Sequence, residues 1–432
     1  MNRDDNEFLT KTGPGTPMGG LFRRYWIPAL LADDLPGPDC PPVRVKLLGE
    51  CLVAFRDTAG RIALIDQQCP HRGASLFFGR NEDGGLRCVY HGWKFDVEGR
   101  CLDMPSEPGN SNFKDKIRVK CYPGRDLGGV IWTYMGPSNL MPALPELEWA
   151  LVPDTHRYLS RRLQECNYLQ AMEGGIDSSH VSSLHRDAAL VSEKTKGSVL
   201  RGKGKGRELV QGDTAPQFEV SETKYGLLIA ARRDADDDSY YWRITPWLMP
   251  WYTMIPPYGE SPLRGHAWVP IDDEHCWVYN MSWHPARSLT REEFAEMRAG
   301  GGIHTEMIPG TDQGKQSKAN DYLIDRELQK SGISYTGIKG IAVQDIAIQE
   351  SMGPVYDRAN EHLGTSDTAI IAARRLLMKA ARSLDDGAIP PGVDPLSQRV
   401  RAASVILPKS ISFQEGAKDF LVAQPGRLFV SA

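Results

Sequence analysis

Short apolar runs separated by turn residues characterise the first third of the chain. Between residues 38 and 150, runs such as VRVKLLG, CLVAFRD, RIALIDQQC and GGVIWTYMG alternate with Gly, Pro and Asp. β-rich runs at intervals of about ten residues are typical of a small all-β domain. We therefore predict such a domain over 38–150. Residues 1–37 then form a lead-in with a short helix in MGGLFRRYWIPALLADDL, and we expect this lead-in to pack on the later, C-terminal domain.

Residues 151–432 combine strand-like and helical patterns. The runs QFEVSET, YGLLIAARR, GHAWVPID and HCWVYNMSW have the composition of strands. The later segment TSDTAIIAARRLLMKAARSLDDG begins with Thr and Ser, repeats apolar residues at helical spacing and carries basic residues toward its end, which predicts a helix. A sheet flanked by helices makes this domain α+β, and the fold class of the whole chain is therefore α+β.

Composition excludes several classes of protein. Of the 432 residues, 41% are hydrophobic and 25% are charged, as in ordinary globular proteins. The formal net charge of -4 lacks the basic excess of a nucleic-acid binder. The sequence contains no apolar run near the roughly 18 residues that a membrane helix needs, and MNRDDNEFLTKTGPGTPMGG has no signal-peptide core. We expect a cytoplasmic protein without nucleic-acid or membrane partners.

Two short segments combine cysteine and histidine in the same order. Cys69 and His71 lie in CPHRGAS, and Cys88 and His91 lie in CVYHGWKF. Zinc sites usually pair like with like, as C-x2-4-C and H-x3-5-H, whereas each pair here is mixed. In a Rieske [2Fe-2S] centre, two cysteines hold one iron and two histidines hold the other. The order predicts a Rieske cluster in 38–150, with zinc as the alternative.

A second group of ionisable residues lies in ECNYLQAMEGGIDSSHVSSLH. Asp177 and His180 are three residues apart and share a helix face, but His185 is five residues further, about 140° around the helix. Both histidines reach one metal only if the helix ends, bulges or bends between them. Two histidines and one carboxylate are the ligands of non-haem Fe(II) oxygenases. Spacing leaves the carboxylate open among Glu173, Asp345, Glu350, Asp357 and Asp367.

With both motifs in one chain, the sequence resembles the oxygenase components of Rieske non-haem iron aromatic-ring oxygenases over essentially its whole length. It is most similar to the phthalate-dioxygenase-type branch, which includes aryl-ether O-demethylases and chlorobenzoate or phenoxybenzoate oxygenases. The resemblance rests on GPGTPMGGLFRRYWIPALL, the two cluster loops, ECNYLQAMEGGIDSSHVSSLH and VQDIAIQESMGPVYDRANEHLGTSDTAIIAARRLL. It implies a catalytic domain whose curved antiparallel sheet grips a long helix, and a homotrimer or stacked trimers.

The resemblance also implies roles for individual residues. The iron ligands would be His180, His185 and Asp345. Asp177 would be the electron relay between the iron and His91 of a neighbouring subunit, and Asn167 matches a polar residue close to the iron. The expected cofactors are a [2Fe-2S] cluster and a mononuclear Fe(II).

Substrates of this branch are mostly aromatic carboxylates, which a guanidinium binds strongly and directionally. Arg207, in the glycine-rich loop GKGKGRE, and Arg243, between aromatic residues in YYWRITPW, are the candidate substrate ligands. The alternative is that both are structural, as we expect of Arg232 and Arg233. The remaining histidines lack partner spacing and are expected to be structural: His156, His266, His275, His284, His304 and His362.

The predicted activity is hydroxylation of an aromatic acid with O2. We favour ring cis-dihydroxylation of a phthalate-like acid slightly over O-demethylation of a methoxylated one, since both use the same iron ligands. A non-catalytic Rieske electron carrier is the alternative from another class. The sequence has no G-x-G-x-x-G segment after a strand and no second cysteine cluster, so electrons are expected to come from a separate NAD(P)H-dependent reductase carrying flavin and an iron–sulfur centre.

Overall fold

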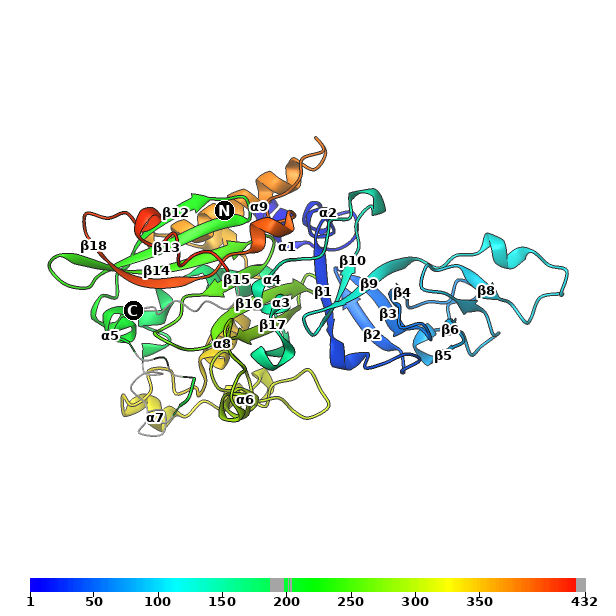
Figure 1. Ribbon diagram of the computed structural model, residues 1–432, viewed down its shortest axis with the longest axis horizontal. Helices are drawn as coiled ribbons and strands as arrows, with labels where there is room; N and C mark the ends of the chain where they lie inside the picture. The colour runs from blue at the N-terminus through cyan, green and yellow to red at the C-terminus, as the bar shows by residue number, and fades with distance from the viewer. Residues whose placement is uncertain (187–197, 201, 203, 425–432) are drawn as a thin grey trace. The chain divides into compact units, whose positions relative to one another are not determined.

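The computed structural model describes residues 1–186, 198–200, 202 and 204–424 (Figure 1). The chain forms two compact units. The first unit is Thr12–Leu144, and the second is Met1–Lys11 together with the chain from Pro145 onward. The predicted domain boundaries at 37/38 and 150/151 therefore differ from the division of the structure.

The first unit contains two antiparallel sheets. A six-stranded sheet has the order β1-β10-β9-β4-β3-β2, and a four-stranded sheet has the order β5-β6-β7-β8. Their strands are β1 (Trp26–Leu31), β2 (Val43–Leu47), β3 (Glu50–Arg56), β4 (Ile62–Asp66), β5 (Arg80–Glu82), β6 (Gly85–Arg87), β7 (Lys94–Phe95), β8 (Cys101–Asp103), β9 (Cys121–Leu127) and β10 (Val130–Tyr134). An all-β first domain, predicted from the spacing of its apolar runs, is confirmed.

The expectation that residues 1–37 pack as one lead-in on the C-terminal domain is corrected. Only Met1–Lys11, with helix α1 (Arg3–Thr10), belongs to the second unit. Helix α2 (Pro17–Phe22) and strand β1 belong to the first unit, where β1 pairs with β10 from Trp26↔Tyr134 to Leu31↔Val130. The segment WIPALL is buried along nearly its whole length, and pairing at the sheet edge satisfies the backbone groups of such an apolar segment.

The second unit is built on one large antiparallel sheet. Its main order is β11-β17-β16-β15-β14-β13-β12, and β18 also pairs with β14. The strands are β11 (Arg157–Gln164), β12 (Gln217–Glu222), β13 (Gly226–Asp234), β14 (Ser239–Leu248), β15 (Tyr252–Ile255), β16 (Leu263–Pro270), β17 (Cys276–Trp283) and β18 (Ala403–Pro408). The helices are α3 (Glu148–Leu151), α4 (Tyr168–Ile176), α5 (Gly206–Gly212), α6 (Arg291–Arg298), α7 (Arg326–Lys330), α8 (Ile341–Ser351), α9 (Thr368–Arg382) and α10 (Phe413–Gly416).

Helices α4, α8 and α9 position the parts of the second unit that matter below. Helix α4 contacts both β16 and α8, and α9 packs on β12 and β13. The predicted helix in TSDTAIIAARRLLMKAARSLDDG is α9, whose apolar face is buried at Ala373, Leu376 and Leu377. The α+β class predicted for this domain is therefore confirmed.

Two glycines allow α4 to approach its neighbours. A Cβ atom on Gly174 would lie 2.3 Å from Nε2 of Gln349 on α8, and one on Gly175 would lie 2.0 Å from the ring of Trp268 on β16. Both distances are far below van der Waals contact. The Trp268 ring leaves no room for a side chain at Gly175, whereas at Gly174 the end of the Gln349 side chain would have to move. Within the described residues, no helix combines the length and apolar character that crossing a membrane requires.

Candidate functional sites

The two Cys/His segments fold into loops with matching hydrogen bonds. The Cys69 amide donates to Ala74 (2.8 Å), and the Gly73 amide donates to the Cys69 carbonyl (2.9 Å). In the second loop, the Cys88 amide donates to Trp93 (2.8 Å), and the Gly92 amide donates to the Cys88 carbonyl (3.0 Å). The glycines have φ of +74° and +77°, a conformation that side-chain-bearing residues rarely adopt.

These loops fit a cluster bound by one cysteine and one histidine from each. Cys69 and Cys88 are buried, whereas the rings of His71 and His91 are partly exposed and their centroids lie 4.4 Å apart. Burial, together with neighbouring Cys88, raises the pKa of Cys69 to about 11. A buried thiol pair of this kind becomes thiolate when it binds a metal. The His71 ring stacks on Trp93 at 4.4 Å, which fixes its plane.

The end of α4 brings the second group of residues together. The helix stops at Ile176, and Asp177 is its extended C-cap (φ -82°, ψ 122°). A separate 3-10 turn, His180–Ser182, follows. The helix therefore does end, as the spacing of the histidines required, but it ends before Asp177 rather than between His180 and His185. Because the chain changes direction there, His180 and His185 face each other with their Nε2 atoms 3.2 Å apart.

Asp345, on α8, completes this group. Its Oδ1 lies 3.2 Å from Nε2 of His185 and 3.6 Å from Nε2 of His180. Ligands about 2.1 Å from a metal ion are separated by about 3 Å when they occupy adjacent positions. The three observed edges match such a face, which leaves the opposite positions open as in two-histidine, one-carboxylate iron sites. The donor set therefore fits a mononuclear iron.

Both histidine rings are oriented through their other nitrogen. Nδ1 of His180 lies 3.2 Å from Oδ2 of Asp177, and Nδ1 of His185 lies 2.8 Å from Oε1 of Gln344. Gln344 is itself fixed, because its Nε2 donates to the Ile338 carbonyl (2.9 Å). Partners of this kind set the tautomer and the direction of a metal-binding histidine. Gln344 was not predicted, although it directly precedes Asp345 in the sequence.

Charges within the group stabilise one another. Burial alone would raise the pKa of Asp345, but His185 and His180 hold it below its usual range. Burial would likewise raise the pKa of Asp177, yet its hydrogen bonds with His180 and with backbone amides lower it. In the metal-free protein, burial would lower the pKa of His180, and the two carboxylates raise it. Two carboxylates facing two imidazoles form a site suited to a cation.

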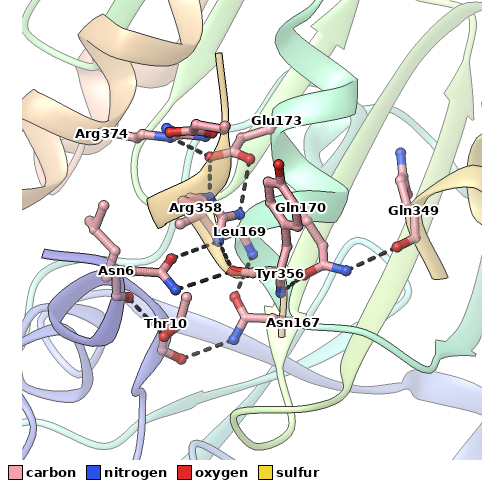
Figure 2. A network of polar contacts seen from close by, with 12 residues as sticks. Asn6, Thr10, Asn167, Leu169, Gln170, Glu173, Gln349, Tyr356, Arg358 and Arg374 are labelled. Atoms are coloured by element: carbon pink, nitrogen blue, oxygen red, sulfur yellow. Dashed lines mark hydrogen bonds and ion pairs between the residues drawn. The ribbon is translucent and has the colours of Figure 1, made fainter. Parts of the chain in front are cut away.

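The other candidate carboxylates on α4 and α8 have different partners. Glu173 pairs with Arg358 (2.9 Å) and Arg374 (2.7 Å), and Figure 2 shows its carboxylate between them. Glu350 accepts from the Glu165 amide (3.0 Å) and from the Tyr322 hydroxyl. Both carboxylates are thus engaged in the interior of the second unit.

Asn167, expected close to the iron, has a structural role instead. Its Oδ1 accepts from the Leu169 amide (3.0 Å), which caps α4, and its Nδ2 donates to the Thr10 carbonyl (2.9 Å) (Figure 2). Nδ2 also donates to the Asp273 carbonyl (2.6 Å). The amide is buried and its hydrogen-bonding groups are in use. It begins α4, whereas Asp177 ends it, and nine helical residues span about 13 Å. The expectation is corrected for this reason.

A cavity of about 140 Å³ adjoins the His180, His185 and Asp345 group. Arg207, on α5, and Arg243, on β14, the two candidate substrate ligands, both line it. Their guanidinium carbons lie 5.0 and 4.5 Å from the centre of the Tyr258 ring. The GKGKGRE segment was expected to be a loop, but from Gly206 it is helical.

Arg243 has the properties of a group that binds a ligand. It is 5% exposed, and among the described residues its Nε and Nη1 have no hydrogen-bond partner. Burial alone would lower its pKa, but Tyr258 and Tyr241 raise it. Arg233, on the neighbouring strand, instead donates to the carbonyls of Ser178 (2.8 Å) and Asp213 (3.0 Å), which agrees with its expected structural role.

Sequence inspection missed two further residues of this cavity, Arg264 and His266 on β16. His266 was expected to be structural. Its Nδ1 lies 2.7 Å from Oδ1 of Asn280, its cross-strand partner on β17. Because His266 and Asn280 are distant in the sequence, their spacing did not indicate that they would be hydrogen-bonded.

Comparison with known protein families accounts for both units. A family model described as the Rieske [2Fe-2S] domain matches residues 25–123, and one described as "LigXa C-terminal domain like" matches residues 133–424. The second match covers more than half of the chain. The chain is a Rieske oxygenase subunit. Its first unit is the Rieske domain, which settles the choice between an iron–sulfur cluster and zinc in favour of the cluster.

Relatives of this Rieske oxygenase subunit match it almost end to end. It is 39% identical to the 3-chlorobenzoate-3,4-dioxygenase oxygenase subunit of Comamonas testosteroni, over 95% of this chain and 96% of the relative. It is 37% identical to the phthalate 4,5-dioxygenase oxygenase subunit of Pseudomonas putida, over 96% and 94%. Among solved structures, dicamba monooxygenase bound to 3,6 dichlorosalicylic acid superposes with a TM-score of 0.57 at 18% identity, covering 85% of this chain and 99% of that one. That structure supports the fold alone.

Proposed function

We propose that this chain is the terminal oxygenase component of a system that hydroxylates an aromatic carboxylate, with ring cis-dihydroxylation of a phthalate-like acid slightly favoured. One observation carries the proposal. His180, His185 and Asp345, whose ligand atoms all lie within 4.8 Å of one another, border the same cavity as Arg207 and Arg243. A cavity with a site for iron and cations for a carboxylate fits an aromatic acid and dioxygen together.

The proposed iron ligands are His180, His185 and Asp345, and the proposed cluster ligands are Cys69, His71, Cys88 and His91. When bound, Fe(II) supplies the centre at which dioxygen is activated. The protein's own groups orient the metal ligands and the substrate, and they keep water away from the aromatic ring. Asp177 and Gln344 hold the two imidazoles in place through Nδ1, and Arg243 binds the carboxylate. Val210, Pro256 and Ile303 line the cavity with apolar surface and exclude water from the ring.

Electrons are proposed to reach the iron across subunits. Oxygenase subunits of this family belong to multicomponent systems with a separate electron-transfer partner, and we propose an NAD(P)H-dependent reductase carrying flavin and an iron–sulfur centre. Asp177 would relay the electron from His91 of a neighbouring chain in a homotrimer or stacked trimers. The Asp177 side chain is 22% exposed and the ring of His91 is also partly exposed, so both are accessible from outside one chain. We also propose a cytoplasmic location.

The relatives support an aromatic acid as substrate. The two named above act, by their names, on 3-chlorobenzoate and phthalate. O-demethylation of a methoxylated acid would use the same iron ligands and differ in which carbon lies near them. A non-catalytic electron carrier is not favoured, because the relatives that match nearly the whole chain are named as oxygenase subunits of dioxygenases.

The proposal is tested by turnover with a surrogate reductase on phthalates, halobenzoates and methoxybenzoates under labelled O2. We expect a dihydrodiol carrying two labelled oxygen atoms from a phthalate or benzoate. Release of formaldehyde from a methoxybenzoate, without a dihydrodiol from any other acid, would favour the demethylase alternative. Failure of every acid to react in protein loaded with both iron centres would overturn the proposal.

A further inference from the structure

A second cavity, of about 40 Å³, lies beside the proposed iron site. It shares three lining residues with the larger cavity: Gly175, His266 and Asp345. The rest of its lining includes Arg162 and Gln164 from β11 and Asn280 from β17. All three are more than nine-tenths buried. Trp268, Val278 and Ile346 also line it. The second cavity is therefore a buried space with polar groups on part of its wall, and it adjoins Asp345.

Arg162 lines this space and has hydrogen-bond donors without a partner among the described residues. Its side chain is 5% exposed, and its Nη2 lies 3.5 Å from Oε1 of Glu350. Among the described residues, its Nε and Nη1 have no hydrogen-bond partner. A buried donor left unsatisfied costs about 1–3 kcal/mol, and internal water normally satisfies such groups. A water needs about 10–15 Å³ of such space, so the second cavity has room for about three.

His266 connects the two cavities with a defined hydrogen-bonding direction. Nδ2 of Asn280 donates to Oγ of Ser160 (3.4 Å), which leaves Oδ1 of Asn280 as the atom facing the ring of His266 at 2.7 Å. An amide oxygen only accepts, so Nδ1 of His266 carries the hydrogen and Nε2 is an acceptor. A ring held in this tautomer lines both cavities and accepts a hydrogen bond from a water or a hydroxyl group.

We propose that the second cavity is a water site, in which about three waters bound to Arg162 hydrogen-bond onward to Asp345 and deliver protons to the iron centre. This rests on the proposed function. Addition of O2 to an aromatic ring as a dihydrodiol consumes two electrons, which come from the cluster, and two protons, which end on the two hydroxyl groups. Both C–O bonds form as the O–O bond breaks. The waters pass on these protons and recover them from solvent, without needing the substrate side of the site.

The first experiment examines the waters themselves. A high-resolution crystal structure of the iron-loaded protein is expected to contain about three ordered waters in the second cavity, with at least one within hydrogen-bond distance of Nε or Nη1 of Arg162. Val278→Ile adds one methylene group to a residue that lines the second cavity alone, and should expel at least one water. A wild-type second cavity without ordered water would overturn the water site, whatever the enzyme's activity.

The second experiment measures proton delivery. In Val278→Ile and in Arg162→Met, iron content should be unchanged, while single-turnover product formation slows by about tenfold or more and the solvent deuterium isotope effect grows. Met281→Leu is the matched control, because Met281 is buried on the same strand and lines neither cavity. Waters present in the wild type, with unchanged rate and isotope effect in both variants, would overturn the proton role. Absence of turnover in the wild type would reject the proposed function instead.

Discussion

Replacing Arg243 by methionine tests the cavity as a carboxylate site. Methionine keeps an unbranched apolar side chain and removes the guanidinium. In the free protein, Nε and Nη1 of Arg243 have no hydrogen-bond partner among the described residues, and the guanidinium lies over the Tyr258 ring at 4.5 Å. The variant therefore loses about 0.5–1 kcal/mol of cation–π interaction and the polar interactions of the guanidinium with Tyr241 and Tyr258, so the free energy of unfolding should fall by about 1–2 kcal/mol.

Substrate binding should be affected far more strongly. A hydrogen bond to a charged group contributes about 1.5–3 kcal/mol, and a guanidinium can donate two such bonds to one carboxylate. We take the lower value of about 3 kcal/mol for the pair, because the carboxylate must lose its water. At 1.4 kcal/mol for each factor of ten, the dissociation constant of the acid rises about 100-fold.

Calorimetric titration of the iron-loaded protein with an aromatic acid and with its neutral methyl ester separates the two roles. Arg243→Met should weaken binding of the acid about 100-fold and change binding of the ester little. The matched control is Arg233→Met, which leaves the carbonyls of Ser178 and Asp213 unsatisfied and should destabilise the fold by about 1–3 kcal/mol. If Arg243→Met destabilises the fold to the same degree and weakens acid and ester equally, Arg243 is structural and the argument is wrong.

Three further predictions concern the metal site and stability. Asp177→Asn should keep both iron centres and lower turnover by about 100-fold or more, as measured by iron analysis and steady-state rates; substantial turnover would argue against the relay. Gln344→Leu removes the partner of His185 and should weaken iron binding by about 10- to 100-fold in chelator competition, whereas Gln344→Glu, which keeps the acceptor, should not. Burial, aided by Arg287, lowers the pKa of His284 to about 4, and its Nδ1 accepts from the amides of Ala286 and Arg287. A lowered folded-state pKa means that stability is present above the ordinary value of about 6.5 and is lost as pH falls toward 4. His284→Asn keeps an acceptor that does not titrate, so calorimetric melting temperatures should fall less steeply over that interval; parallel curves would contradict the assignment.

Features encoded locally could be predicted from the sequence. The order of cysteine and histidine in two short segments predicted the Rieske domain. The five-residue spacing of His180 and His185 predicted that no regular helix carries both, and α4 ends before them, at Ile176. The capping role of Asn167 was equally local, because asparagine is a preferred residue directly before a helix. The sequence prediction instead placed Asn167 near the iron and did not consider its capping role.

Features that depend on pairing between distant strands could not be predicted. His266 acquires its orientation from Asn280 on the next strand, and the sequence does not contain the register. Strand β11, with the sequence RYLSRRLQ, was not recognised because charged residues are rarely buried. Its Arg161 lies inside because Asp312 accepts from Nη2 at 2.8 Å, a partner about 150 residues away.

The two glycines on α4 restrict which residues of this protein can change its substrate range. Gly174 and Gly175 line the larger cavity. This wall has no side chain to shorten, and the Trp268 ring leaves no room for one at Gly175. Selection for a bulkier or smaller aromatic acid therefore has to act on the facing residues, such as Val210 and Ile303. Mutant libraries that spare the glycines and vary those positions should yield new substrates without loss of iron.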